Sequence, residues 1–107
     1  MTERFAEQLE QDLPPEDVRH ILGVFAADLE RLWGILEVAE DRETLGRTAH
    51  ALAGAAGVVG ASTLETACRA VMADAGPAAM VAHRRSMSAA VDAARRACAG
   101  HAVSRVP

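Results

Sequence analysis

The stretch Thr48-Ala49-His50-Ala51-Leu52-Ala53-Gly54-Ala55-Ala56-Gly57-Val58-Val59-Gly60-Ala61 places one imidazole inside a run of small residues. With helical periodicity this region has one apolar stripe, made of Leu45, Ala49, Leu52, Ala56 and Val59. His50 is two residues from Leu52, so it lies roughly 200° around the helix axis from that leucine. The sequence therefore predicts a helix that buries the stripe and presents His50 on the opposite face.

The surroundings of His50 on this helix carry little side-chain volume. Its neighbours one turn away are Gly46, Arg47, Ala53 and Gly54, and Gly57 follows two turns on. Glycine inside a helix costs about 1 kcal/mol relative to alanine, so these glycines are poor choices for helix stability alone. They suit a face where something bulky must come close to the ring. A nucleophilic imidazole on such a bare face predicts an acceptor site offered to another macromolecule.

The composition favours an all-α fold. Half of the 107 residues are apolar, but the chain has only two Phe, one Trp and no Tyr, and many of the apolar residues are Ala. Alanine is the best helix former, and the β-branched residues are scattered. The length suits one domain with one modest core, so we expect a single domain over residues 1–107.

Apolar periodicity and punctuation by Pro, Gly and Asp divide the chain into five predicted helices. They cover residues 1–13, 16–40, 42–59, 63 to the Ala75-Gly76-Pro77 break, and 77–99, with 100–107 as a frayed tail. Asp41 is the expected N-cap of the helix that carries His50, and Gly60 is its expected C-cap. Because short connections force neighbouring helices to be antiparallel, we expect an up-down-up-down four-helix bundle over 16–99, with the helix 1–13 capping one end.

Charge and hydropathy exclude several classes of function. The net charge of -4 argues against a nucleic-acid-binding protein, which normally has a basic face. No apolar run approaches the length of a membrane span, and the charged N-terminus does not resemble a signal peptide. We therefore expect a cytoplasmic protein that binds neither nucleic acid nor membrane, and that is a monomer.

His50 is the strongest chemical candidate in the chain. The four histidines are widely separated, and Cys68 and Cys98 lack metal-type pairing, so we expect no bound metal and two reduced thiols. No glycine-rich phosphate loop follows a strand, and no Ser or Cys forms a nucleophilic triad with a histidine and a carboxylate. The sequence thus predicts no cofactor site and no enzyme active site of its own.

The segment from His50 to Ala61 resembles the signature of histidine-containing phosphotransfer (HPt) domains. That signature usually reads His-x-Leu-Lys-Gly, two small residues, a short gap and then Gly-Ala. The resemblance extends over roughly residues 18–72 and includes Phe25, Leu32, Leu36, Leu64 and Cys68. One position departs from it, because Ala53 stands where the family usually has Lys. Arg47, one turn before His50, is the expected substitute for that charge beside a phosphoryl group of about two negative charges.

The resemblance implies a function for this site. His50 would accept a phosphoryl group, through its outer Nε2, from an aspartate of a receiver domain, and pass it to an aspartate of a second receiver. Such receivers belong to response regulators or hybrid histidine kinases and supply the Mg²⁺. Arg47, Ala53, Gly54 and Gly57 would support the phosphoryl group or the docked partner. The chain would be a phosphocarrier without a kinase or nucleotide site.

Two alternatives remain open at this level. One is an HPt-like helical interaction module that no longer transfers phosphate, because the family Lys is Ala53. The other is a plain helical bundle, such as a dimerisation domain, in which His50 has no role.

Overall fold

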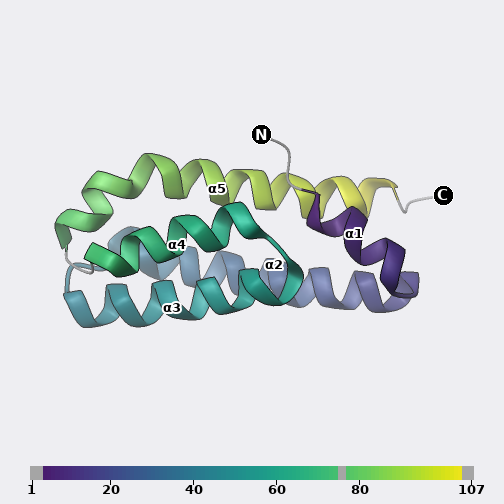
Figure 1. Ribbon diagram of the computed structural model, residues 1–107, viewed down its shortest axis with the longest axis horizontal. Helices are drawn as coiled ribbons and strands as arrows, with labels where there is room; N and C mark the ends of the chain where they lie inside the picture. Colours follow the sequence, from purple (N-terminus) through teal and green to yellow (C-terminus); the bar gives the residue numbers. More distant parts are fainter. Residues whose placement is uncertain (1–3, 75–76, 105–107) are drawn as a thin grey trace.

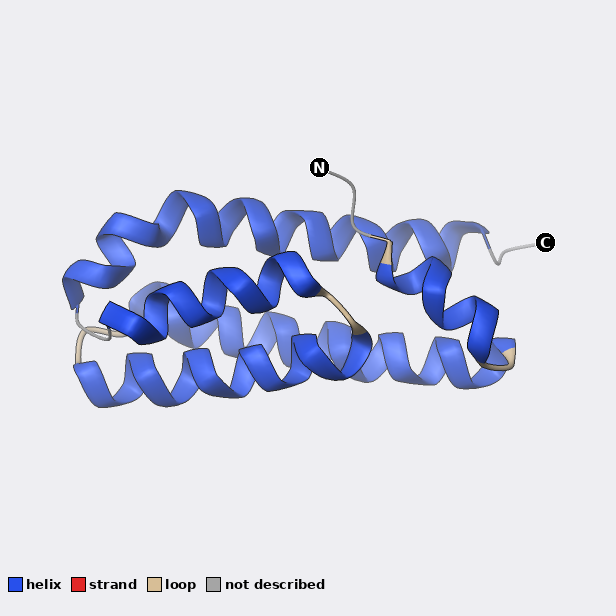
Figure 2. Ribbon diagram, in the orientation of Figure 1, coloured by secondary structure: helices blue, strands red, loops and turns tan. Residues whose placement is uncertain are grey.

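The computed structural model describes residues 4–74 and 77–104, and every element in this part of the chain is a helix (Figures 1 and 2). The helices are α1 (Phe5–Asp12), α2 (Pro15–Val38), α3 (Arg42–Val59), α4 (Ser62–Asp74) and α5 (Pro77–Ser104). The expected all-α fold class is confirmed.

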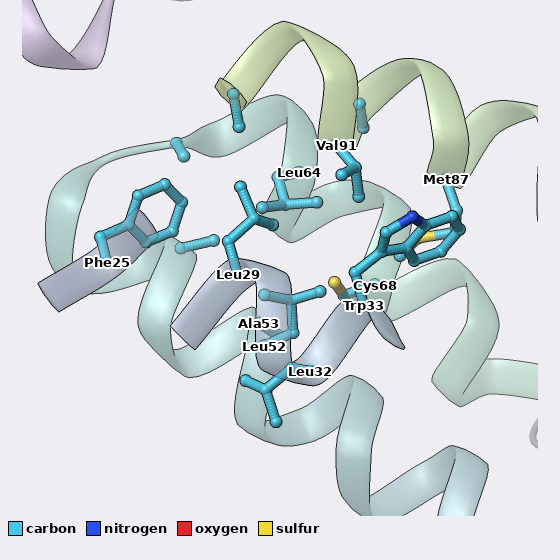
Figure 3. Packing of buried hydrophobic residues seen from close by; sticks show 14 of the residues in the cluster. Phe25, Leu29, Leu32, Trp33, Leu52, Ala53, Leu64, Cys68, Met87 and Val91 are labelled. Carbon is cyan, nitrogen blue, oxygen red and sulfur yellow. The ribbon is translucent and has the colours of Figure 1, made fainter. Parts of the chain in front are cut away.

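Helices α2 to α5 surround a shared core. Helix α3 contacts α2 and α4, and α5 contacts the same two helices, so α3 and α5 lie across the molecule from each other (Figure 1). Leu29, Leu52, Leu64 and Met87 come from these four helices, are almost fully buried, and converge in Figure 3. Each such side chain contributes about 1.5 to 3 kcal/mol on burial.

Helix α1 covers one end of this core. It contacts α2, α3 and α5, and it buries Phe5 and Ala6. The Phe5 ring meets Phe25 of α2 edge to face, with the ring centroids 5.6 Å apart and the planes at 78°. Residues 1–3 of the expected capping segment lie outside the described residues.

Both predicted ends of α3 are confirmed. The backbone N–H of Thr44 donates to Oδ2 of Asp41 at 2.8 Å, and this hydrogen bond holds the pKa of the Asp41 carboxyl below its usual value. At the other end Gly60 adopts a left-handed conformation with φ 82° and lets the chain turn into α4. That conformation costs an L-residue roughly 1 to 2 kcal/mol, which explains the glycine.

Helix α5 is longer than the predicted last helix, which ends at residue 99. Helix α5 continues through Gly100 to Ser104, and residues 105–107 lie outside the description. A single glycine lowers helix stability by only about 1 kcal/mol, so it does not end a helix when no second signal accompanies it.

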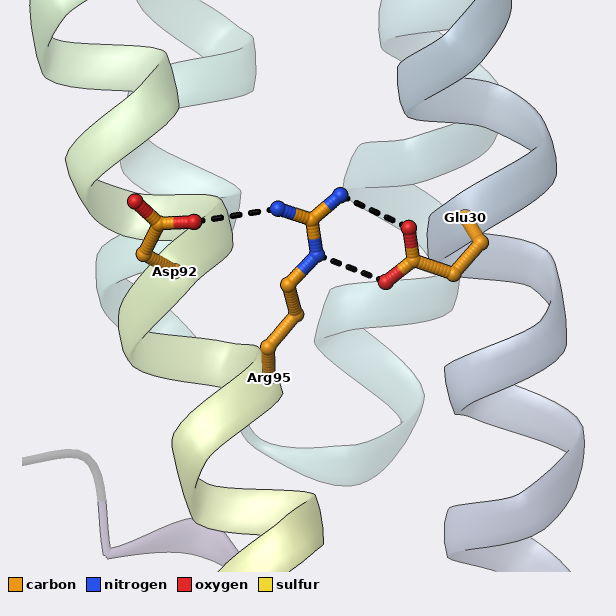
Figure 4. Close-up of polar contacts among 3 residues, drawn as sticks. All are labelled: Glu30, Asp92 and Arg95. Carbon is orange, nitrogen blue, oxygen red and sulfur yellow. Dashed lines mark hydrogen bonds and ion pairs between the residues drawn. The ribbon is translucent and has the colours of Figure 1, made fainter.

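An ion pair between Arg95 of α5 and Glu30 of α2 connects these two helices (Figure 4). Arg95 donates from Nε and Nη2 to the two carboxylate oxygens of Glu30, at 2.6 and 2.7 Å, and from Nη1 to Asp92 at 3.0 Å. These hydrogen bonds keep the pKa of Glu30 below its usual value.

No helix in the described part of the chain combines the length and hydropathy needed to cross a bilayer.

Candidate functional site

His50 lies in the middle of α3 with an exposed side chain, as the sequence predicts. The buried residues of α3 occupy the other side of the helix and are Leu45, Thr48, Ala49, Leu52, Ala53, Ala56 and Val59. The two caps define where α3 begins and ends. Burial of the apolar side determines how the helix is turned about its axis, so the His50 ring points away from the core.

The exposed residues of α3 around the ring form a surface that we name the His50 face, and they are Arg47, His50, Ala51, Gly54, Gly57 and Val58. At Gly54 no atom comes within 4 Å of the position that a Cβ would occupy. At Gly57 the same position lies 3.5 Å from Oε2 of Glu65, which comes from α4. The face is therefore open beside His50 and bordered by an α4 side chain one turn further on.

The prediction that Ala53 lies on this surface is wrong, because its exposed fraction is only 3%. Ala53 is about 300° around the axis from His50, at the boundary between the two faces. It lies one turn from both Ala49 and Ala56, which are fully buried. A residue at such a boundary is assigned by the neighbouring helices, and here the packing encloses it.

Arg47 lies on the His50 face, with an exposed side chain. Its Nη1 is 3.5 Å from Oε1 of Glu43, one turn toward the start of α3. Pairs with both side chains in water are weak, so this guanidinium is free to change partner. The structure thus places its positive charge on the predicted face but directs it away from the glycines.

An apolar groove of about 320 Å³ runs beside the His50 face, between α2 and α3. Val24 and Phe25 of α2 and Ala55 and Val58 of α3 line it. Both valines are unusually exposed, Val24 at 51% and Val58 at 81%. Exposed apolar side chains grouped around a groove are typical of a surface that binds another protein. The sequence pattern alone does not reveal this groove, although Val58 stands out as an apolar residue outside the buried stripe.

Glu65 and Arg69 of α4 form a second feature that the sequence analysis missed. Arg69 donates to Oε2 of Glu65 from Nη2 at 2.7 Å and from Nε at 3.2 Å. A Glu followed by Arg four residues later on a helix is a recognisable pair. Its position against Gly57 depends on how α4 packs along α3, which the local pattern does not give.

The two thiols are unsuited to nucleophilic chemistry at neutral pH, and the imidazole of His83 already has a carboxylate partner. Burial raises the pKa of the Cys68 thiol to about 12 and that of Cys98 to about 11, so both thiols stay protonated. His83 is paired through Nε2 with Oδ2 of Asp74 at 2.9 Å. Among the side chains that the structure describes, no three from His, Cys, Asp or Glu gather as a metal site would require.

Comparison with known proteins identifies a family. A family model described as the Hpt domain matches residues 2–98. Searches among curated proteins and among solved structures gave no match. Hpt domains are phosphotransfer modules of two-component signalling that interact with receiver domains. Since the match spans nearly the whole sequence and its histidine motif lies on an exposed helix face, the chain belongs to the Hpt domain family.

Proposed function

We propose that His50 is the phosphoacceptor of a phosphorelay, which takes a phosphoryl group from a receiver aspartate and delivers it to a second receiver. The observation that carries this proposal is the exposed imidazole of His50 on an open helix face, in a chain of the Hpt domain family. Neither thiol offers an alternative, because both are protonated at neutral pH.

The chemistry is an in-line displacement. The Nε2 lone pair of His50 attacks phosphorus, an N–P bond forms, and the P–O bond to the receiver aspartate breaks. The carboxylate leaves with the bonding electrons, while the proton on Nδ1 stays in place. Reversal on a second aspartate restores the neutral ring. Such transfer depends on positioning and charge neutralisation, and Mg²⁺ is supplied by the receiver. The chain acts as a carrier and not as an enzyme.

The receiver would dock on the His50 face and on the adjacent groove. Gly54 leaves room for loops of the partner around the ring. Val58 and Val24 offer apolar contacts to the partner that the buried Ala53 cannot offer. Because a relay partner must also leave, we expect a small and transient interface.

The architecture that we infer is an up-down-up-down antiparallel four-helix bundle capped by α1, in one domain. It is supported by the short connections between helices and by the contacts of α2 and α4 with both α3 and α5. A bundle of this size acts as a monomeric cytoplasmic module in our proposal.

The test is a phosphotransfer assay against phosphorylated receiver domains of the source organism. We expect acid-labile phosphate on the protein, and its complete loss in His50→Gln. The control His83→Gln removes another imidazole and should keep the label. If receivers bind but no label appears, the chain is an interaction module; if no receiver binds, it is a plain bundle. Either result would refute the proposed relay.

A further inference from the structure

Phosphorylation of His50 would add about two negative charges to the His50 face, and this raises the question of which cation meets them. Three exposed ion pairs of the described structure lie on the helix that carries this face or on the helices that flank it. They are Arg47 with Glu43 on α3, Arg69 with Glu65 on α4, and Arg31 with Asp28 on α2. Asp28 also lines the groove beside the face. The position three residues after His50 is Ala53, which is buried and uncharged.

The contact at Gly57 sets the register of α4 on this face. The carboxylate of Glu65 lies 3.5 to 3.6 Å from the position of a Cβ on Gly57, so this turn of α4 touches the open side of α3. After Gly60 the chain folds back, and α4 runs along α3 in the opposite direction (Figure 1). Each further turn of α4 therefore brings its outer residues closer to the ring.

This register brings Arg69 near the level of His50. From Gly57 back to His50 is about 10.5 Å along the axis of α3, and from Glu65 to Arg69 is about 6 Å along α4. The two backbones are thus offset along the axis by about 4.5 Å, which is less than one helical turn. The side chain of Arg69 is 64% exposed and lies on the turn that follows Glu65. Because this side chain is already mostly exposed, it can turn toward the His50 face without uncovering buried residues.

Glu65 binds the guanidinium of Arg69 in the unphosphorylated protein, but it does so with only one of its carboxylate oxygens. Both of its hydrogen bonds go to one oxygen, Oε2 of Glu65, so the bidentate capacity of the guanidinium is unused. Exposed ion pairs are weak, and a phosphoryl dianion with three oxygens is a stronger acceptor than a single carboxylate oxygen. Glu65, whose side chain is 28% exposed, can be hydrated when Arg69 leaves.

We propose that Arg69 binds the phosphoryl group on His50, and that Glu65 keeps it beside the face until phosphorylation. This inference rests on the proposed function of His50. The exchange moves hydrogen bonds from Nε and Nη2 of Arg69 to phosphoryl oxygens, and no covalent bond changes. Arg47 is directed toward Glu43, at the start of α3 and away from Gly54 and Gly57, so we assign it no comparable part. A cation on α4 thereby serves the phosphoryl group, where Ala53 offers no charge.

The experiment labels His50 with phosphoramidate, so that no receiver is needed, and follows the phosphorus resonance of the full chain with pH. We expect Arg69→Gln to raise the pKa of the phosphoryl group by about one pH unit, because a bound cation favours the dianion. Glu65→Gln should lower that pKa, and Arg69→Lys should give an intermediate value. In the wild type, the Nε–H resonance of Arg69 should shift on phosphorylation.

Two control variants test whether the effect on the phosphoryl pKa is specific to Arg69. Arg47→Gln removes the rival cation, and Arg85→Gln removes one charge from α5, across the molecule from α3. Both should leave the phosphoryl pKa within a few tenths of the wild type. An unchanged pKa in Arg69→Gln, or a full effect in Arg47→Gln, overturns this inference while leaving the phosphoacceptor role intact. A His50 that takes no phosphoryl group from any donor ends both proposals. Circular dichroism checks that each variant is folded.

Discussion

In the proposed docking of a receiver, Gly54 determines how closely the partner can approach the ring of His50. A Cβ added at this exposed position would meet no atom within 4 Å, so a larger side chain would begin in open space. We expect Gly54→Leu to keep or raise the free energy of unfolding, since glycine is the poorer helix former by up to about 1 kcal/mol. Phosphotransfer should nevertheless slow on the order of 100-fold, because a misplacement of about 1 Å costs that much.

The matched control for this variant is Gly34→Leu. Gly34 is a helical glycine of α2 that also has nothing within 4 Å of an added Cβ. It should gain the same helix stability and transfer at the wild-type rate. Equal transfer rates in the two variants would show that the open surface at Gly54 has no role in docking. Urea denaturation and a single-turnover transfer assay provide the two readouts.

The sequence predicts the direction of a side chain where helical periodicity alone determines it. It does not predict the direction where packing between helices determines it. The outward direction of His50 follows from Leu52 and the buried stripe alone, and the structure agrees. Ala53 lies at the boundary of the stripe, where periodicity assigns neither face. Arg69 is visible as part of a helical ion pair, but its place beside the His50 face depends on the register between two helices.

Helix α1 stabilises the fold through one aromatic side chain. Phe5 is 2% exposed and packs edge to face on Phe25. We expect Phe5→Ala to lower the free energy of unfolding by about 3 to 5 kcal/mol, as large-to-small changes of buried aromatics do. The exposed Gln8→Ala on the same helix should change it by less than about 0.5 kcal/mol. Similar urea midpoints for the two variants would mean that α1 adds little to the core.

The ends of elements are predictable where a residue has a specific local role. Asp41 and Gly60 delimit α3 because a side-chain oxygen and a left-handed backbone satisfy the free groups at its ends. Gly100 carries neither role, and α5 runs past it. The helices could therefore be read from the sequence, whereas the length of α5 depends on the absence of a second stop signal.

At the scale of the whole molecule, the pair of Glu30 and Arg95 couples stability to pH. Hydrogen bonding by Arg95 lowers the pKa of Glu30 in the folded chain. The stabilisation is therefore complete above the ordinary carboxyl pKa of 4.5 and is lost as the pH falls through the lower folded value. Both side chains are about half exposed, so we expect only about 0.2 to 1 kcal/mol from the pair.

The measurement is the difference in urea stability between the wild type and Glu30→Gln at pH 7 and pH 3. It should shrink at the lower pH, because pH 3 lies below the ordinary carboxyl pKa of 4.5 and the stabilisation by the carboxylate decreases as the pH falls. A difference of the same size at both pH values would mean that the carboxylate charge does not stabilise the fold. The partners are 65 residues apart in the chain, so no local pattern could have predicted the contact.

The thiol of Cys68 has a consequence for how this fold can be observed. It is fully enclosed among apolar side chains, and its pKa of about 12 leaves almost no thiolate at neutral pH. An alkylating reagent can therefore modify it only during excursions in which the helices separate. The rate of that modification, followed by mass spectrometry, therefore reports how often the native helices open. A docked receiver that stabilises the helix packing would lower this rate without contacting the sulfur.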